Sequence, residues 1–97
     1  MGHMIALIWI NSLVDFESYR AKVLATLKSY GGEIMFRAEK IVTLVDENKL
    51  GGFSQIALFR FPSQKRMNDW YRSDVYHNLK KLCENAGSFT IFGFNPN

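Results

Sequence analysis

The chain has 97 residues, of which 47% are hydrophobic and 22% charged, and its net charge is +3. This length predicts one domain, and the composition is typical of a packed globular fold. No apolar run reaches the roughly 18 residues of a membrane span, and the small net charge does not require a nucleic-acid or membrane partner. We expect the domain to cover residues 4–97, because residues 1–3 resemble a cloning scar.

A strand and an amphipathic helix open the predicted fold. The run 4–11 is apolar and β-rich, which predicts the first strand. A helix is predicted from a cap at Asp15 to Tyr30, because apolar side chains recur there at helical spacing. The apolar face of this helix would hold Phe16, Tyr19, Val23, Leu27 and Tyr30. Gly31 and Gly32 then end the helix, since glycine tolerates the left-handed conformation that follows many helices.

Two more strands are predicted before the next helix. The second strand begins near Glu33, is interrupted by a bulge around 37–39, and resumes over 41–45. The segment 46–52 carries the acidic, amide and glycine residues that are typical of a turn. The third strand covers 54–61, where the residues are mostly apolar and β-rich.

Two helical segments and a last strand complete the prediction. Pro62 ends the third strand because it cannot donate a ladder hydrogen bond, and Ser63 is a suitable helix N-cap. The first of these helices carries an apolar stripe of Met67, Trp70 and Tyr71. Ser73 or Asp74 offers a second cap. The second segment would turn inward the side chains of Tyr76, Leu79, Leu82, Cys83 and Ala86. The last strand is predicted over 88–94.

This order of elements predicts an α+β domain of the ferredoxin-like type, β-α-β-β-α-β with a four-stranded antiparallel sheet. The first and third strands would be central, and both are apolar on both faces, as strands are when both faces are buried. The helices of such a domain cover only one face of the sheet. A second copy packed sheet to sheet would cover the other face, so we expect a homodimer.

Several short motifs give the chain a resemblance to a known family. The residues that carry it are Tyr19, Tyr30-Gly31-Gly32, Arg37, Phe61-Pro62-Ser63, Trp70-Tyr71, Ser73 and Tyr76. In this order and spacing they resemble domain-of-unknown-function family thirteen-thirty, which belongs to the dimeric α/β-barrel superfamily. The resemblance implies ferredoxin-like subunits that pair sheet to sheet. The wider superfamily includes cofactor-free monooxygenases, isomerases and haem-binding enzymes, so the fold alone does not identify a function.

Three positions depart from the pattern of this family. Ala38 and Glu39 stand where the family often has two glycines after the second-strand arginine. Cys83 stands where the family often has an arginine. If that arginine contacts an anionic ligand in relatives, this chain lacks the contact.

The candidate ligand-binding residues are mostly aromatic. Arg37 would either hold an anionic or carbonyl group through its guanidinium or discourage wrong strand pairing as an edge charge. Trp70, Tyr71, Tyr19 and Ser73 are expected around the same ligand, with core packing as the alternative for the aromatic rings.

Tyr76 and His77 are the candidate catalytic residues, because each could transfer a proton. Histidine is the natural general acid or base at neutral pH, but His77 lies about 100° around the helix from the inward-facing Tyr76, which favours an exposed position. No second histidine or suitably spaced carboxylate accompanies His77, so we expect no metal and no cofactor. Cys83, the one cysteine, is expected to pack in the core, and its solitude makes a cytoplasmic location the simplest expectation.

Three functions are open on this evidence. The first is a homodimer that binds a small organic molecule between helices and sheet, as a binding protein or as a cofactor-free enzyme. The second is an RNA-binding module, but Gln55 stands where such a domain needs a stacking aromatic, so no nucleic-acid partner is expected. The third is a structural or regulatory dimer without a ligand.

Overall fold

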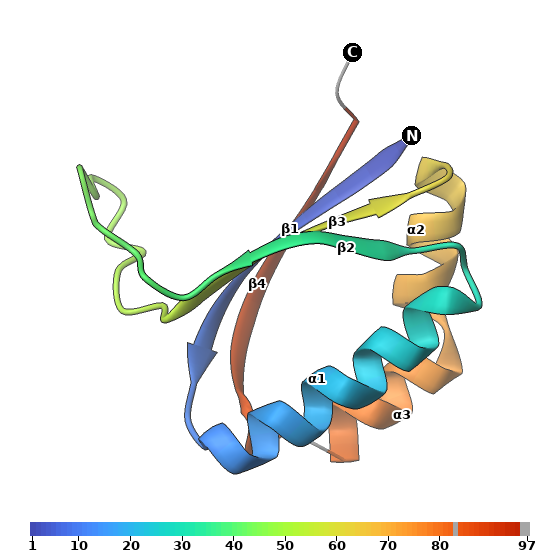
Figure 1. The fold of residues 1–97 in the computed structure, drawn as a ribbon, viewed down its shortest axis with the longest axis horizontal. Coiled ribbons are helices and arrows are strands. Elements are labelled where there is room, and N and C mark those ends of the chain that lie inside the picture. Colours follow the sequence, from blue (N-terminus) through green and yellow to red (C-terminus); the bar gives the residue numbers. More distant parts are fainter. Residues whose placement is uncertain (83, 96–97) are drawn as a thin grey trace.

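The computed structural model describes residues 1–82 and 84–95, which form a four-stranded antiparallel sheet with three helices against one face (Figure 1). The strands are β1 (Gly2–Ile10), β2 (Glu33–Ala38), β3 (Gln55–Phe61) and β4 (Gly87–Phe94). The helices are α1 (Leu13–Lys28), α2 (Gln64–Arg72) and α3 (Asp74–Leu82). The strand order is β2-β3-β1-β4, so the predicted central place of the first and third strands is confirmed.

The side chains of the central strands alternate between two environments. In β1, Met4 and Ala6 face the helices and are buried, and they pair across the sheet with Phe59 and Ala57 of β3. The residues between them point to the other face and are half-buried: Ile5, Leu7, Trp9, Ile56 and Leu58. In the described part of the chain no helix lies on that second face, which we call the open face (Figure 1).

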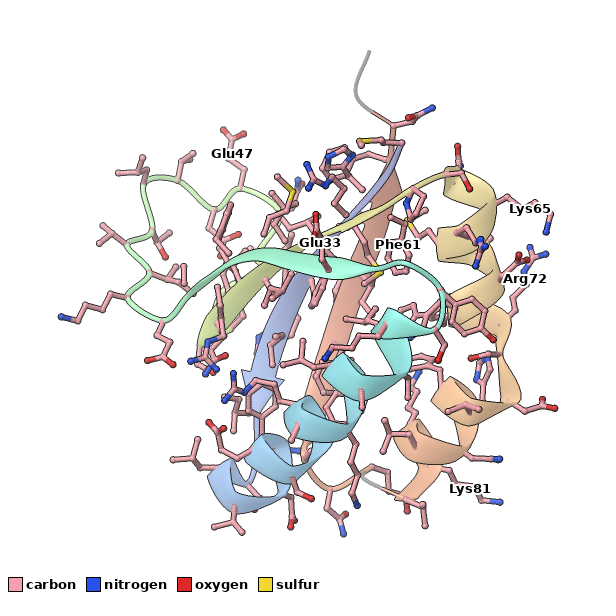
Figure 2. The ribbon with its side chains drawn as sticks, turned by 45° about the vertical axis from the view of Figure 1, so that its right-hand side comes forward. Glu33, Glu47, Phe61, Lys65, Arg72 and Lys81 are labelled. Carbon is pink, nitrogen blue, oxygen red and sulfur yellow. The ribbon has the colours of Figure 1, made fainter. Side chains whose placement is uncertain are left out.

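The core fills the space between the helices and the covered face of the sheet. The buried stripe of α1 consists of Phe16, Tyr19, Val23 and Leu27, which are four of the five predicted residues; Tyr30, the fifth, lies beyond the end of the helix at Lys28 and is half-buried. Trp70 of α2 and Tyr76 of α3 are each only 1% exposed, and their ring centroids lie 4.4 Å apart. Phe61 of β3 lies 5.8 Å from the Trp70 ring, on the helix side of the sheet (Figure 2). Rings of this size bury the largest apolar areas in the domain, and area removed from water is the main stabilising term.

Serine hydroxyls cap the first two helices. The Ser63 hydroxyl accepts from the backbone N–H of Arg66 at 3.1 Å, as predicted. At α1 the cap is Ser12, whose hydroxyl accepts from the N–H of Asp15 at 3.3 Å. The helix therefore begins earlier than the predicted cap at Asp15. Asp15 lies in the first turn, where its negative charge interacts favourably with the positive end of the helix dipole.

The segment between β2 and β3 was predicted wrongly in two respects. The irregularity in β2 lies between Ile34 and Phe36, not around 37–39, and β2 ends at Ala38. Residues 41–45 form no strand; they belong to a long loop, 39–54, that projects away from the three helices (Figure 1).

Backbone geometry in this loop explains why 41–45 has no strand to pair with. Gly52 adopts φ 95°, so the chain turns immediately before β3 and cannot extend that strand backward. The Asp46 carboxylate accepts from the N–H groups of Leu50 and Gly51 at 2.8 Å each, which closes the loop on itself. The base of the loop is held by Trp9, whose indole N–H donates to the Gly51 carbonyl at 3.1 Å.

The first strand begins at Gly2, two residues before the predicted start. Gly2 pairs with Phe61, and His3 pairs with Arg60 on one side and Phe94 on the other. The predicted start of this strand at Met4 was therefore two residues late, because neighbouring strands supply partners as far as Gly2.

The predicted inward face of α3 is confirmed in part. Tyr76, Leu79 and Ala86 are buried, but Leu82 is 80% exposed because the helix ends there and its side chain no longer faces the sheet. Cys83 lies outside the described residues. Among residues 1–82 and 84–95, no helix has the length and apolar character needed to cross a membrane.

Candidate functional site

A cavity of about 50 Å³ lies between α1 and the covered face of the sheet. Ala6 and Ala57 face each other there in the β1–β3 register, and their short side chains leave room that larger residues would fill. Bulky apolar and aromatic side chains surround this space, including those of Phe16, Phe59 and Trp70. Since one water molecule needs roughly 10–15 Å³ by this kind of measure, the cavity is larger than a packing defect.

Two tyrosine hydroxyls meet at the cavity. The Oη atoms of Tyr19 and Tyr76 lie 3.2 Å apart in a buried hydrogen bond between α1 and α3. Burial raises the pKa of the Tyr76 hydroxyl from its usual value of 10.0; the hydrogen bond from Tyr19 lowers this pKa, and the neighbouring Tyr71 raises it. Tyr76 therefore stays protonated near neutral pH, where it can donate or accept a hydrogen bond but does not serve as a base.

Two other polar groups at the cavity have no hydrogen-bond partner among the described residues. Gln55 is only 5% exposed, and its Oε1 atom is unpaired. Arg37 has one terminal nitrogen, Nη2, at 3.1 Å from Glu39 Oε1, while its other terminal nitrogen, Nη1, is buried and unpaired. Such groups are costly to bury, so each needs an explanation such as a bound molecule.

Some of the partly exposed lining residues mark the mouth of the cavity. Arg20 and Leu24 from α1 lie there with Ile34 and Arg37 from β2, whereas the half-buried lining residues Phe89 and Ile91 of β4 border the neighbouring cleft. Arg37 therefore lines the cavity while it also belongs to the edge strand β2, so both roles predicted for it stay open. The mouth opens between the first helix and the edge strand β2.

Trp70 forms a fixed wall of the cavity. Its indole N–H donates to the Thr26 hydroxyl at 3.0 Å, and that hydroxyl donates to the Val23 carbonyl at 2.7 Å. Both ends of the indole are thus held, by this hydrogen bond on one side and by the Tyr76 ring on the other.

Tyr71 lies at a second, neighbouring cleft of about 250 Å³ between α2, α3 and β4. This outer cleft is also lined by Asn68 and Lys80, and Tyr71 itself is 41% exposed. Residues that border both spaces are Met4, Tyr76, Phe89 and Ile91. The 50 Å³ cavity and the 250 Å³ cleft are therefore separate spaces with a few side chains between them, and a single aromatic ring, which needs roughly 150 Å³, would displace some of these side chains on entering the cavity.

His77 and Ser73 line neither space. His77 is exposed, and its ring packs edge-on against Tyr71 and Tyr76 at 5.6 and 5.8 Å. The Ser73 hydroxyl donates to the Trp70 carbonyl at 2.7 Å and lies 3.2 Å from the N–H of Tyr76, from which it accepts. Ser73 thus joins α2 to α3 and fixes the position of Tyr76, which is a local structural role.

Gln55 is the site residue that the sequence analysis did not assign to the cavity. It lies at the start of β3, in the strand position whose side chain points to the helices. The available indication in the sequence was a glutamine at an inward-facing position of an otherwise apolar strand.

Residues 1–93 match the family described as Domain of unknown function (DUF1330). The chain belongs to this family. The resemblance that the sequence motifs carry is confirmed over nearly the whole domain. No curated protein matches the chain.

Several solved structures share the fold of this DUF1330 domain. A protein of unknown function from Rhodopseudomonas palustris is 14% identical, with 99% of this chain and 82% of that chain covered and a TM-score of 0.78. A dimeric ferredoxin-like protein of unknown function from Jannaschia sp. CCS1 is 6% identical, with 98% of each chain covered and a TM-score of 0.67. SnoaB, a cofactor-independent oxygenase from Streptomyces nogalater, is 13% identical, with 99% and 92% covered and a TM-score of 0.64. At these identities the likeness establishes the ferredoxin-like fold alone.

The residues that line the cavity of this DUF1330 domain can bind a small molecule and form hydrogen bonds with it. The polar groups that line it, among the described residues, are the two tyrosine hydroxyls, the Gln55 amide and the guanidinium groups of Arg20 and Arg37. They can orient a small molecule and donate hydrogen bonds to its oxygen atoms.

Proposed function

We propose that the protein is a homodimer in which each subunit binds a small, partly apolar organic molecule in the cavity between α1 and the sheet. The observation that carries this proposal is a pair of buried polar atoms, Gln55 Oε1 and Arg37 Nη1, that lack partners among the described residues at an otherwise apolar cavity. Apolar walls with a few placed polar groups are the usual composition of a small-molecule site. Tyr19, Tyr76 and Trp70 complete the proposed site.

The open face of the sheet supports the homodimer. Its centre is formed by apolar residues of β1 and β3, and Phe36 and Phe92 beside them are 51% and 53% exposed. An apolar patch of this extent is uncommon on a monomer and typical of an interface. A second copy of the same face is the simplest cover, and the dimeric description of the Jannaschia protein agrees with it. A cytoplasmic location, expected from the single cysteine, belongs with this proposal.

A second candidate function is cofactor-free catalysis in the same cavity, and the protonated Tyr76 hydroxyl favours it. A buried hydroxyl that keeps its proton can donate to an oxygen on which negative charge develops. The fold shared with SnoaB is compatible with this role. His77 remains a predicted proton carrier only, because it lies outside the cavity.

Fluorescence of Trp70 provides the test of ligand binding. The chain has two tryptophans, so the variant Trp9→Phe leaves Trp70, in the cavity wall, as the only indole emitter. We expect titration with single-ring aromatic compounds to change this emission. Ala57→Leu, which fills the cavity floor, should abolish the change, and Gln55→Leu should weaken it without altering the cavity shape. Val75→Leu on the exposed side of α3 is the matched control. Unchanged emission with all compounds would contradict the proposal.

Light scattering on the purified protein tests the homodimer. We expect twice the mass of the 11.2 kDa chain at low micromolar concentration. The mass of a single chain would contradict the dimer and leave the open face as a surface for another partner, with RNA as the first to titrate.

A further inference from the structure

The two cations at the mouth of the cavity each have a carboxylate of their own. Arg37 Nη2 lies 3.1 Å from Glu39 Oε1, and Arg20 Nη2 lies 3.0 Å from Glu17 Oε2. Among the described residues that line the cavity, these two arginines are the only charged ones. The mouth is therefore electrically balanced before any ligand binds.

An anionic ligand at Arg37 would meet the Glu39 carboxylate as well as the guanidinium. The free donor, Nη1, and the occupied donor, Nη2, belong to one planar group, so a carboxylate on Nη1 would lie within about 6 Å of Glu39. Like charges at this separation repel, and the repulsion is stronger where water is partly excluded. A neutral acceptor such as a carbonyl oxygen would bind Nη1 without this repulsion.

Gln55 requires a hydrogen-bond donor from the ligand, whereas Arg37 requires an acceptor. Its unpaired atom, Oε1, can only accept, so it needs a hydroxyl or N–H hydrogen from the bound molecule. Arg37 pairs in the sheet with Ala57, two residues along β3 from Gln55, and all three side chains border the cavity. A free donor and a free acceptor therefore lie on neighbouring strands of one small site.

We infer that the cavity takes an uncharged, ring-sized organic molecule that carries both a carbonyl-type acceptor and a hydroxyl-type donor, and that Glu39 sets the preference for an uncharged ligand. This inference rests on the proposed function, since it specifies what the same cavity binds. Arg37 Nη1 donates to the acceptor of the ligand, and Gln55 Oε1 accepts from its hydroxyl. Tyr19 and Tyr76 line the space between the helices and the ring.

A matched pair of compounds tests the charge preference. The probes are 3-hydroxybenzamide, which is neutral, and 3-hydroxybenzoate, which has the same shape and is anionic near neutral pH. In the Trp9→Phe background we expect Trp70 fluorescence to report binding of the amide at least about tenfold tighter than binding of the benzoate. Glu39→Gln should tighten benzoate binding about tenfold and change amide binding by less than about twofold.

Two further variants separate the contributions. Glu47→Gln removes an exposed carboxylate from the same loop and should change neither affinity. Gln55→Leu should weaken binding of 3-hydroxybenzamide about tenfold but leave benzamide, which lacks the hydroxyl, within about twofold. Equal losses for both amides would overturn the role of Gln55 as the hydroxyl acceptor.

The possible failures are distinguishable. Tighter binding of the benzoate by the unmodified protein, or an unchanged ratio in Glu39→Gln, overturns the inference about charge while ligand binding itself stands. Failure of both probes to bind any variant overturns the inference as well, and the wider titration of aromatic compounds then decides separately whether the cavity binds ligands at all.

Discussion

The two faces of the sheet are built from alternating residues of the same strands, and both are mainly apolar, yet they differ in the polar groups that they hold. The covered face holds the polar groups that are costly to bury, among them Gln55, Arg37 and the tyrosine pair. The open face, which water can reach, is apolar at its centre, and its ion pair between Glu33 and Arg60 lies toward the edge strand β2.

The two faces are suited to different uses. Polar side chains that are buried under the helices without partners do not stabilise the folded domain. Their presence on the covered face is therefore consistent with a ligand site. Apolar side chains left half-exposed fit an interface that a second copy completes. Mutations on the covered face should therefore change mainly folding stability, and mutations on the open face should change mainly assembly.

The largest expected effect comes from the covered face. Trp70→Ala removes a ring that is 1% exposed and that contacts both Phe61 and Tyr76. We expect it to lower the free energy of unfolding by about 3–5 kcal/mol, because it loses buried area and leaves a cavity. Urea unfolding followed by circular dichroism measures this change. Val75→Ala, on the exposed side of α3, should stay within about 0.5 kcal/mol, and an equal loss in both variants would refute the contrast.

The open face should respond in assembly rather than in folding. Leu58→Lys places a charge at the centre of this face, where the neighbouring strand contributes Ile5. We expect the dimer to weaken at least about a hundredfold, because an unpaired charge cannot be buried in an apolar interface. Light scattering should then give the mass of one chain, while the circular dichroism spectrum is retained. Val75→Lys is the control that adds the same charge elsewhere, and a dimer that persists in Leu58→Lys would show that this face is not the interface.

Much of the fold could be predicted from the sequence because its determinants are local. Glycine pairs, the Ser63 cap and helical spacing of apolar residues fix the number, type and order of the elements. The loop 39–54 could not be predicted, because 41–45 has the composition of a strand and only the absence of a neighbouring strand makes it a loop. The start of α1 was misplaced because Ser12 and Asp15 are both suitable caps, and their backbone conformation decides between them.

The site could be predicted only where a residue's role follows from its face of an element. Tyr19, Trp70 and Tyr76 were expected to point inward, and all three border the cavity. His77 was proposed for its chemistry although its helical position favoured exposure, and the structure places it outside. Gln55 stood out as a glutamine in an apolar strand, but its place at the cavity could not be predicted because the hollow at Ala6 and Ala57 depends on the register of two strands.

A smaller effect tests how firmly the helical cover is held. Ser63→Ala removes the hydroxyl that accepts from Arg66 N–H at the start of α2. We expect the free energy of unfolding to fall by about 1 kcal/mol, the usual cost of losing a helix N-cap. The control is Ser88→Ala, an exposed serine in β4, which should change stability by less than about 0.5 kcal/mol. Equal values for the two variants in urea unfolding would show that this cap does not stabilise α2.

The smallest expected effect is a pH dependence in the contribution of Tyr76, on the covered face, to the free energy of unfolding. Burial raises the pKa of Tyr76, so the folded protein holds this proton more tightly than the unfolded chain does. The resulting stability is fully present below the unfolded pKa of about 10 and is lost as the pH rises through the folded pKa. Tyr76→Phe should be less stable than the unmodified protein by about 1 kcal/mol near neutral pH, because the bond to Tyr19 is lost. That difference should narrow above about pH 10, because the variant has no proton to lose at this position. Urea unfolding across the alkaline range measures it, with Tyr30→Phe as the matched tyrosine control; a difference that stays constant with pH would mean that the Tyr76 hydroxyl is not held protonated by the covered face.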